Sequence, residues 1–187
     1  MIVAMTQFRI LLLRFFRGVC LSALACLPNF VTAATLDVAE TFIDAFYSFH
    51  PETLSAVTTP GMDADNALYY QAWAKAAHYQ IQNRRPCTSS EVGKAECRIT
   101  VTDDFGTTLG YTATDTFFLT ITDSKVAKVT FEGDDPLIFY AVYVWIMIKQ
   151  PEVLSGPCKD MFEGGDTPAE CAVAISDAAH EFMNWWD

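Results

Sequence analysis

One carboxylate stands within an otherwise apolar series, and it is the residue that most directly suggests chemistry. From Leu109 to Ile121 every second residue is apolar except Asp115. Because successive side chains of a strand point to opposite faces, Asp115 is predicted on the buried face of a long strand. A carboxyl group in that position can take part in acid/base chemistry. The alternative is a β-bulge near Thr114 that turns Asp115 to solvent or to a backbone cap.

His78 is the candidate partner of Asp115 in an acid/base pair. It closes a predicted helix, beside Tyr79, where its ring would either face a pocket or interact with the helix dipole. Four aromatic residues are predicted either to line that pocket or to belong to the ordinary core. They are Tyr69, Trp73, Tyr111 and Phe117.

Two acidic pairs, Asp103-Asp104 and Asp134-Asp135, stand at predicted turns and helix starts. Both lack the alternating oxygen ligands of a calcium loop, so we interpret them as solvated. No serine or cysteine nucleophile stands in a recognisable triad context. The sequence therefore predicts no metal site and no cofactor.

Periodic apolar patterns predict the elements that would position these residues. The predicted helices are residues 36–46 with Asp37 and Glu40 as a capping box, a short helix from Pro51, residues 67–78, and a last helix capped by Thr167 to Glu170. The predicted strands are residues 79–83, 96–102, and a hairpin of 109–121 and 125–131 that turns at Asp123-Ser124 with Ala127, Val129 and Phe131 inward; residues 103–106 are predicted as a turn.

The segment 137–148 is apolar on all sides. At about a dozen residues it is too short to span a bilayer, which requires about 20. It is predicted to be a buried helix, a continued strand or a subunit contact, and we favour the helix.

Residues 1–34 have the pattern of a secretory signal peptide. Three arginines precede an apolar segment, and small residues follow at the positions that a signal peptidase reads. Cleavage is predicted after Ala33 or Ala34, giving a secreted or periplasmic protein with no stable membrane span after cleavage. The alternatives are an uncleaved anchor and a lipoprotein acylated at Cys26.

Four cysteines follow this leader: Cys87, Cys97, Cys158 and Cys171. An even number in an exported chain predicts disulfides, and of the three pairings, proximity favours Cys87–Cys97 and Cys158–Cys171. A zinc site would require closely paired ligands such as C-x-x-C, which this sequence lacks.

The chain is strongly acidic. Its formal charge is −11, and removal of the three arginines of the leader lowers it to −14. Such a surface repels phosphate backbones and anionic lipid head groups, so no nucleic-acid partner is expected.

The chain resembles the nuclear-transport-factor-2-like superfamily, which includes the SnoaL-like and ketosteroid-isomerase-like proteins. Two features carry the resemblance: the order of the predicted elements, and the aromatic strand, polar turn and β-branched strand in FFLTITDSKVAKVTF. The resemblance covers residues 36–133. It implies an α+β fold in which a cone-shaped, curved antiparallel sheet wraps around N-terminal helices and leaves a pocket, often in a homodimer. The expected domains are a signal peptide (1–34), this domain (35–135) and a C-terminal helical extension packed on it (136–187).

Within this resemblance, the place of Asp115 is similar to that of the oxyanion-hole aspartate of ketosteroid isomerases. That aspartate stays protonated in an apolar site and donates a hydrogen bond to the substrate oxygen. Phe42 stands where those enzymes carry a tyrosine. The segment that would hold their basic aspartate is shortened to the neighbourhood of residues 59–65.

Three functions follow from these observations. The favoured one is an exported, SnoaL-like protein that binds a small apolar ligand. The first alternative is an isomerase, dehydratase or hydrolase that uses Asp115 and His78 as acid/base groups. The second is a protein-interaction domain whose segment 137–148 packs on a partner. The fold alone cannot decide among these functions, because one scaffold hosts several of them.

Overall fold

The computed structural model of the protein describes residues 27–186, apart from the side chains of residues 27–32 and Met62. Its elements, in chain order, are α2 (Leu27–Tyr47), α3 (Pro51–Val57), α4 (Met62–Ala76), β1 (Gln80–Arg84), β2 (Thr88–Glu91), β3 (Lys94–Thr102), α5 (Asp104–Leu109), β4 (Ala113–Thr122), β5 (Lys125–Gly133), α6 (Leu137–Lys149), α7 (Pro151–Ser155) and α8 (Pro168–Trp186).

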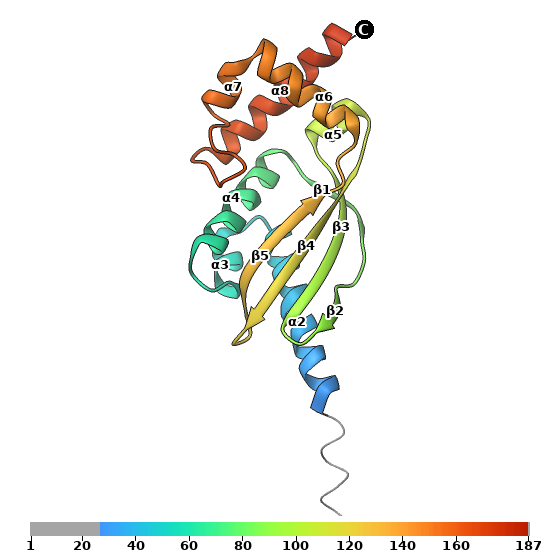
Figure 1. Ribbon diagram of the computed structural model, residues 1–187, viewed down its shortest axis with the longest axis vertical. Helices are drawn as coiled ribbons and strands as arrows, with labels where there is room; N and C mark the ends of the chain where they lie inside the picture. Colours follow the sequence, from blue (N-terminus) through green and yellow to red (C-terminus); the bar gives the residue numbers. More distant parts are fainter. Residues whose placement is uncertain (1–26, 187) are drawn as a thin grey trace, which may run out of the picture.

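The fold is α+β, with an open antiparallel sheet of five strands (Figure 1). The strands lie in the order β1-β3-β4-β5, and the short β2, which the sequence did not predict, pairs with β3. In the centre of the sheet Phe117 lies opposite Cys97 on one side and Phe131 on the other. The predicted alternation of β3 is confirmed, since Cys97, Ile99 and Val101 are buried.

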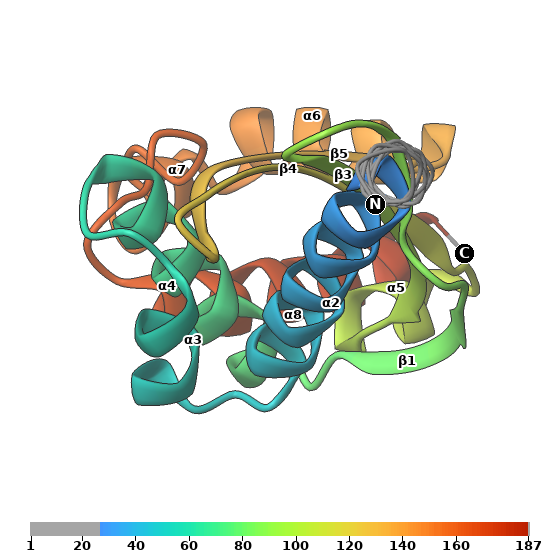
Figure 2. The same cartoon turned by 90° about the horizontal axis from the view of Figure 1, so that it is seen from below.

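The sheet curves around α2, and α3 and α4 lie beside its β5 edge (Figure 2). Phe42 and Ile43 of α2 are fully buried against the inner face of the sheet. The Phe42 and Phe117 ring centroids are 6.2 Å apart. We call the buried residues gathered here the sheet cluster: Ala39, Phe42, Ile43, Ala45, Phe46, Leu54, Ala67, Ala74, Cys87, Ala95, Cys97, Ile99, Val101, Phe117, Leu119 and Val126.

The helices α5 to α8 gather at one end of the sheet (Figure 1). They form a second core together with part of α4, because α8 packs on both α4 and α5. We call its buried residues the helical cluster: Tyr69, Phe105, Val142, Ile146, Cys158, Met161, Cys171, Ile175, Ala178, Ala179 and Phe182.

The predicted hairpin of β4 and β5 is confirmed, with one change of register. Asp123 and Ser124 both have positive φ angles, as a two-residue hairpin turn of the common mirror-image type requires. The pairing then shifts, because Thr120 lies opposite Lys128 while Ile121 lies opposite Val126. This bulge buries Val126 in place of Ala127, which was wrongly predicted to face inward.

The turn predicted at residues 103–106 is wrong, and so is the start of the strand predicted at Leu109. The Asp103 side chain accepts a hydrogen bond from the Gly106 amide at 2.6 Å, which caps the short helix α5. Gly110 ends this helix in the left-handed conformation, with φ 75°. β4 therefore begins only at Ala113.

Two helix starts also differ from the prediction. α4 begins at Met62 after Gly61, and no side chain caps it. α2 begins at Leu27, so Glu40 lies inside a helix and does not belong to a capping box. Its carboxylate instead accepts hydrogen bonds from Arg84 at 2.6 Å and from the Cys87 amide at 2.5 Å. Glu40 thus ties α2 to β1 and to the first disulfide.

The helix predicted in the apolar segment is confirmed as α6, and the last predicted helix as α8. The Thr167 carbonyl accepts a hydrogen bond from the Cys171 amide at the start of α8, at 2.9 Å, and the Thr167 hydroxyl donates to the Pro157 carbonyl at 2.8 Å. Both favoured disulfide pairings are present. Cys87–Cys97 joins the β1–β2 connection to β3, and Cys158–Cys171 joins the loop after α7 to α8.

The predicted signal peptide lies mostly outside the described residues. Its predicted end, at Ala33 or Ala34, falls within α2, and the first buried side chain described is that of Thr35. Within residues 27–186 none of the helices combines the length and the apolar character that crossing a bilayer requires. The two disulfides fit a protein of an oxidising compartment, while export itself stays a prediction.

Candidate functional site

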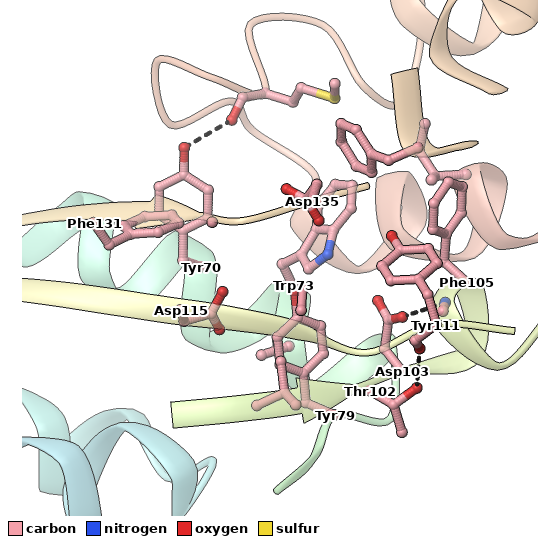
Figure 3. Close-up of a pocket in the computed structure, with 18 of the residues that line it drawn as sticks. Tyr70, Trp73, Tyr79, Thr102, Asp103, Phe105, Tyr111, Asp115, Phe131 and Asp135 are labelled. Carbon is pink, nitrogen blue, oxygen red and sulfur yellow. Dashed lines mark hydrogen bonds between the residues drawn. The ribbon is translucent and has the colours of Figure 1, made fainter. Parts of the chain in front are cut away.

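An aromatic cavity of about 190 Å³ lies between the inner face of the sheet, α4 and the helices at the end of the sheet (Figure 3). Eleven of its 23 lining residues are aromatic. Tyr70 packs edge-on against Phe131 with ring centroids 4.3 Å apart, and its hydroxyl lies 3.5 Å from the Met161 carbonyl oxygen. This volume is close to the volume of about 150 Å³ of a buried apolar cavity that binds benzene.

Asp115 lines this cavity from β4. The pairing of β4 with β3 is regular through Thr114 and Asp115, so the bulge considered as an alternative does not occur there. The Tyr47 hydroxyl donates a hydrogen bond to the Asp115 carboxylate at 3.2 Å. Burial raises the pKa of Asp115 from its usual 3.8 to about 7, against the opposing effect of the Tyr47 bond, and the nearby Asp135 and Asp103 raise it further.

Tyr47 is a partner that the sequence did not reveal. The resemblance placed Phe42 where a catalytic tyrosine would stand, and Phe42 is indeed a buried core residue. Tyr47 stands at the end of the same helix and reaches Asp115 from there. Burial raises the Tyr47 pKa far above its usual value, and the Asp115 carboxylate raises it further. The hydroxyl is therefore a hydrogen-bond donor at any physiological pH.

Two more carboxylates line the same cavity, and the interpretation of both acidic pairs as solvated is wrong for Asp103 and Asp135. Burial raises the pKa of Asp103 to about 6, although the Gly106 amide bond opposes the shift. Burial, followed by repulsion from Asp134, raises the pKa of Asp135. Asp134 itself lies outside the cavity and accepts a hydrogen bond from the Thr114 amide.

His78 does not join Asp115. It follows α4 in the left-handed conformation, with φ 55°, and its side chain is 72% exposed. Its Nδ1 atom lies 2.7 Å from a carboxylate oxygen of Asp104, the exposed neighbour of Asp103. His78 is absent from the residues that line the cavity.

Three of the four predicted aromatic residues line the cavity: Trp73, Tyr111 and Phe117. Tyr69 instead packs in the helical cluster, with its hydroxyl buried and without a hydrogen-bond partner among the described residues. The sequence missed Tyr79 and Phe131. Phe131 could have been inferred from its place on the inward face of the predicted hairpin, opposite Phe117.

No lysine, arginine or histidine is among the lining residues. Arg84, whose charge acts on Tyr47, is engaged outside the cavity by Glu40 and Asp44. Among the residues with described side chains, no group of three or more His, Cys, Asp or Glu is placed to hold a metal ion. The carboxylates are thus distributed around the cavity wall and do not converge on one point.

Comparison with protein-family models and with curated proteins finds no match for this chain.

Proposed function

We propose that this protein is an exported binding protein that holds a small, largely apolar molecule in the aromatic cavity. The observation that carries this proposal is the lining itself, in which aromatic rings from α4, the sheet and the C-terminal helices surround one space. Concave sites with apolar walls and a few polar groups are typical of small-molecule binding. The cavity volume favours a ligand with a single ring or a short chain.

We also propose a nuclear-transport-factor-2-like ancestry of the SnoaL-like type. The supporting observations are the order of α2, α3 and α4 before an antiparallel sheet, and the curvature of that sheet around α2 (Figure 2). The cavity lies on the inner side of the sheet, as in the fold that the resemblance implies. This ancestry permits binding and catalysis equally.

The native mass of the protein tests the binding proposal. Protein secreted by its own host and purified gently is expected to show a small-molecule excess mass by native mass spectrometry, which disappears on denaturation. Ala113→Leu, which adds volume to the cavity wall, is expected to lower the loaded fraction, whereas Ala127→Leu on β5, outside the cavity, leaves it unchanged. Equal native and denatured masses would contradict an occupied pocket.

Catalysis in the same cavity is a narrower proposal. Asp115 and Asp103 have pKa values near 7 and 6, a range in which a carboxyl group can both take up and release a proton at neutral pH. The geometry pairs Asp115 with Tyr47 rather than with His78. An isomerase or dehydratase of this chain would therefore use Asp115, with Tyr47 positioning its carboxyl group from outside the cavity lining.

Self-association is a second candidate function, favoured by the outer face of α6. Large exposed apolar side chains recur on this face at helical spacing, and Leu137 is 86% and Ile148 69% exposed. The face consists of Leu137, Tyr140, Val144, Met147 and Ile148. A second copy of the chain is the partner that this face fits best. The face carries no charge, so two copies of this acidic chain could meet there without direct charge repulsion. A two-fold interface uses the same patch on both copies, and this apolar patch can pair with itself.

Val144→Glu is expected to weaken this dimer by at least about tenfold, because an unpaired carboxylate would be buried at the centre of the interface. Analytical ultracentrifugation over a range of concentrations measures the shift. Val173→Glu, the same substitution at an exposed position of α8, is the matched control and should leave the dimer intact. A wild-type protein that is monomeric at all concentrations would exclude self-association.

A further inference from the structure

The cavity wall carries charge of one sign only. Its charged residues are Asp103, Asp115 and Asp135, and they come from three separate places: the residue that caps α5, the first part of β4 and the connection from β5 to α6. Since no basic side chain lines the cavity, nothing in the wall neutralises them. Above the pKa values of Asp115 (about 7) and Asp103 (about 6), as at pH 8, a molecule that enters therefore meets negative charge.

These carboxylates retain unused hydrogen-bonding capacity. Asp115 accepts from Tyr47, and Asp103 accepts from the Gly106 amide. Within the described part of the chain, no side chain donates to Asp135, and none of the three forms an ion pair. A carboxylate can accept about four hydrogen bonds, so a donor in the cavity would find free acceptors on each.

Aromatic faces lie among the three carboxylates. In Figure 3 the rings of Trp73 and Tyr79 occupy the region between Asp115 on one side and Asp103 on the other, with Asp135 nearby. Tyr111 adds a further ring close to Asp103. An aromatic face attracts a cation placed within about 6 Å of its centre, most strongly for tryptophan and when water is excluded.

We propose that the ligand of this cavity is an organic cation, a protonated amine or quaternary ammonium group on a small hydrocarbon body. The positive group lies against Trp73 and Asp115, and the hydrocarbon part contacts the phenylalanines of the sheet. This inference rests on the proposed binding function and assigns the class of its ligand.

The competing ligand classes fit the wall less well. An anion would be repelled by all three carboxylates. A neutral apolar molecule would displace water from Asp115 and Asp135 without replacing its hydrogen bonds, which costs free energy. A bare metal ion would require oxygen ligands gathered at one point, and the carboxylates here are distributed around aromatic rings.

Three probes of equal ring size and different charge test the inference: benzylamine, benzyl alcohol and benzoate, titrated at pH 8 into the protein freed of bound ligand. Binding is followed by calorimetry and by tryptophan fluorescence, since Trp73 lines the cavity. We expect benzylamine to bind at least about tenfold more tightly than benzyl alcohol, and benzoate not to bind. Asp115→Asn is expected to lower this tenfold preference at least about threefold, because the carboxylate placed against the positive group is lost while Asp103 and Asp135 remain. Asp177→Asn on the exposed surface of α8 removes the same charge elsewhere and should change nothing.

Each remaining outcome decides against a stated claim. If benzyl alcohol binds as tightly as benzylamine, or if the preference is unchanged in Asp115→Asn, the cation inference is wrong and the apolar binding function stands. If none of the three probes binds and the native mass shows no excess, both the inference and the proposed binding function are wrong.

Discussion

Replacing Asp115 by asparagine is expected to stabilise the folded protein at pH 8, by up to about 4 kcal/mol of unfolding free energy. The fold raises the pKa of this carboxyl from 3.8 to about 7, and each unit of pKa corresponds to about 1.4 kcal/mol of cost to the charged form. Asparagine has nearly the same shape, can still accept the Tyr47 hydrogen bond, and carries no charge. Urea unfolding at pH 8 and at pH 4 measures the effect.

The sign of the pH dependence follows from proton linkage. Well below pH 3.8, the usual pKa of an aspartate, Asp115 is protonated in both the folded and the unfolded chain, so the stability associated with its raised pKa is fully present. As the pH rises to about 7, the unfolded chain releases the proton first, and this stability is lost. The benefit of asparagine therefore grows from pH 4 to pH 8.

Several groups around Asp115 share this titration. Asp103 and Asp135 face the same cavity with raised pKa values, Asp134 lies close by, and Tyr47 donates to the carboxylate. Removing the Asp115 charge also lowers the pKa values of the neighbouring carboxyl groups. The measured change in unfolding free energy therefore belongs to the whole group of carboxyls and not to Asp115 alone. Asp177→Asn, on the exposed surface, should change the stability by less than about 0.5 kcal/mol. A loss of stability at pH 8, or an equal change at both pH values, would show that Asp115 is not desolvated.

Phe117→Ala is expected to lower the unfolding free energy by about 3 to 5 kcal/mol, the usual range for a phenylalanine removed from a core. Phe117 is 2% exposed and packs against rings from two elements. Its centroid lies 5.2 Å from that of Phe46 and 6.0 Å from that of Phe131. Its removal would also enlarge the aromatic cavity, because Phe117 lines it. Urea unfolding at neutral pH gives the value.

The next residue of β4 provides the matched control. Phe118 is on the opposite face of the same strand and is 38% exposed. Phe118→Ala removes the same number of atoms, yet it should cost less than about 1 kcal/mol, because most surface substitutions have small effects. Similar losses for the two variants would mean that the inner face of β4 is not the packed face.

The sequence was informative wherever one local pattern determines structure. Alternation identified the inner faces of β3 and β4, including the position of Asp115. Proximity along the chain identified both disulfides. A two-residue polar turn identified the hairpin. In each case the interaction joins residues that are near in sequence or repeat with a period of two.

The errors arise where the outcome depends on one side chain or on distant packing. α5 has six residues and no apolar period, and its start depends on the hydrogen bond from Gly106 to Asp103. The burial of Asp103 and Asp135 could not be seen locally, since an acidic pair at a turn is normally solvated. They line the cavity because the turns that carry them lie at the end of the sheet that the C-terminal helices cover.

His78 shows the same limit at a single residue. Its place at the end of α4 was predicted correctly, but its direction depends on the left-handed backbone at that position. There the ring meets Asp104. The sequence can therefore predict that a histidine lies close to the end of a helix. It cannot predict the partner of that histidine, because the partner depends on the backbone conformation of the folded chain.

The aromatic cavity lies at the boundary between the sheet cluster and the helical cluster. Phe46 and Phe117 of the first and Phe105, Ile146 and Ile175 of the second form parts of one wall. Atoms that line a void lack dispersion contacts with the opposite wall. Because the void lies between the two clusters, each cluster stabilises the other less than it would in a filled core. Unfolding of the two clusters is therefore expected to be less tightly coupled in the empty protein than in the filled one. A molecule that fills the void would contact both clusters, so its binding would make the unfolding of the two clusters more cooperative.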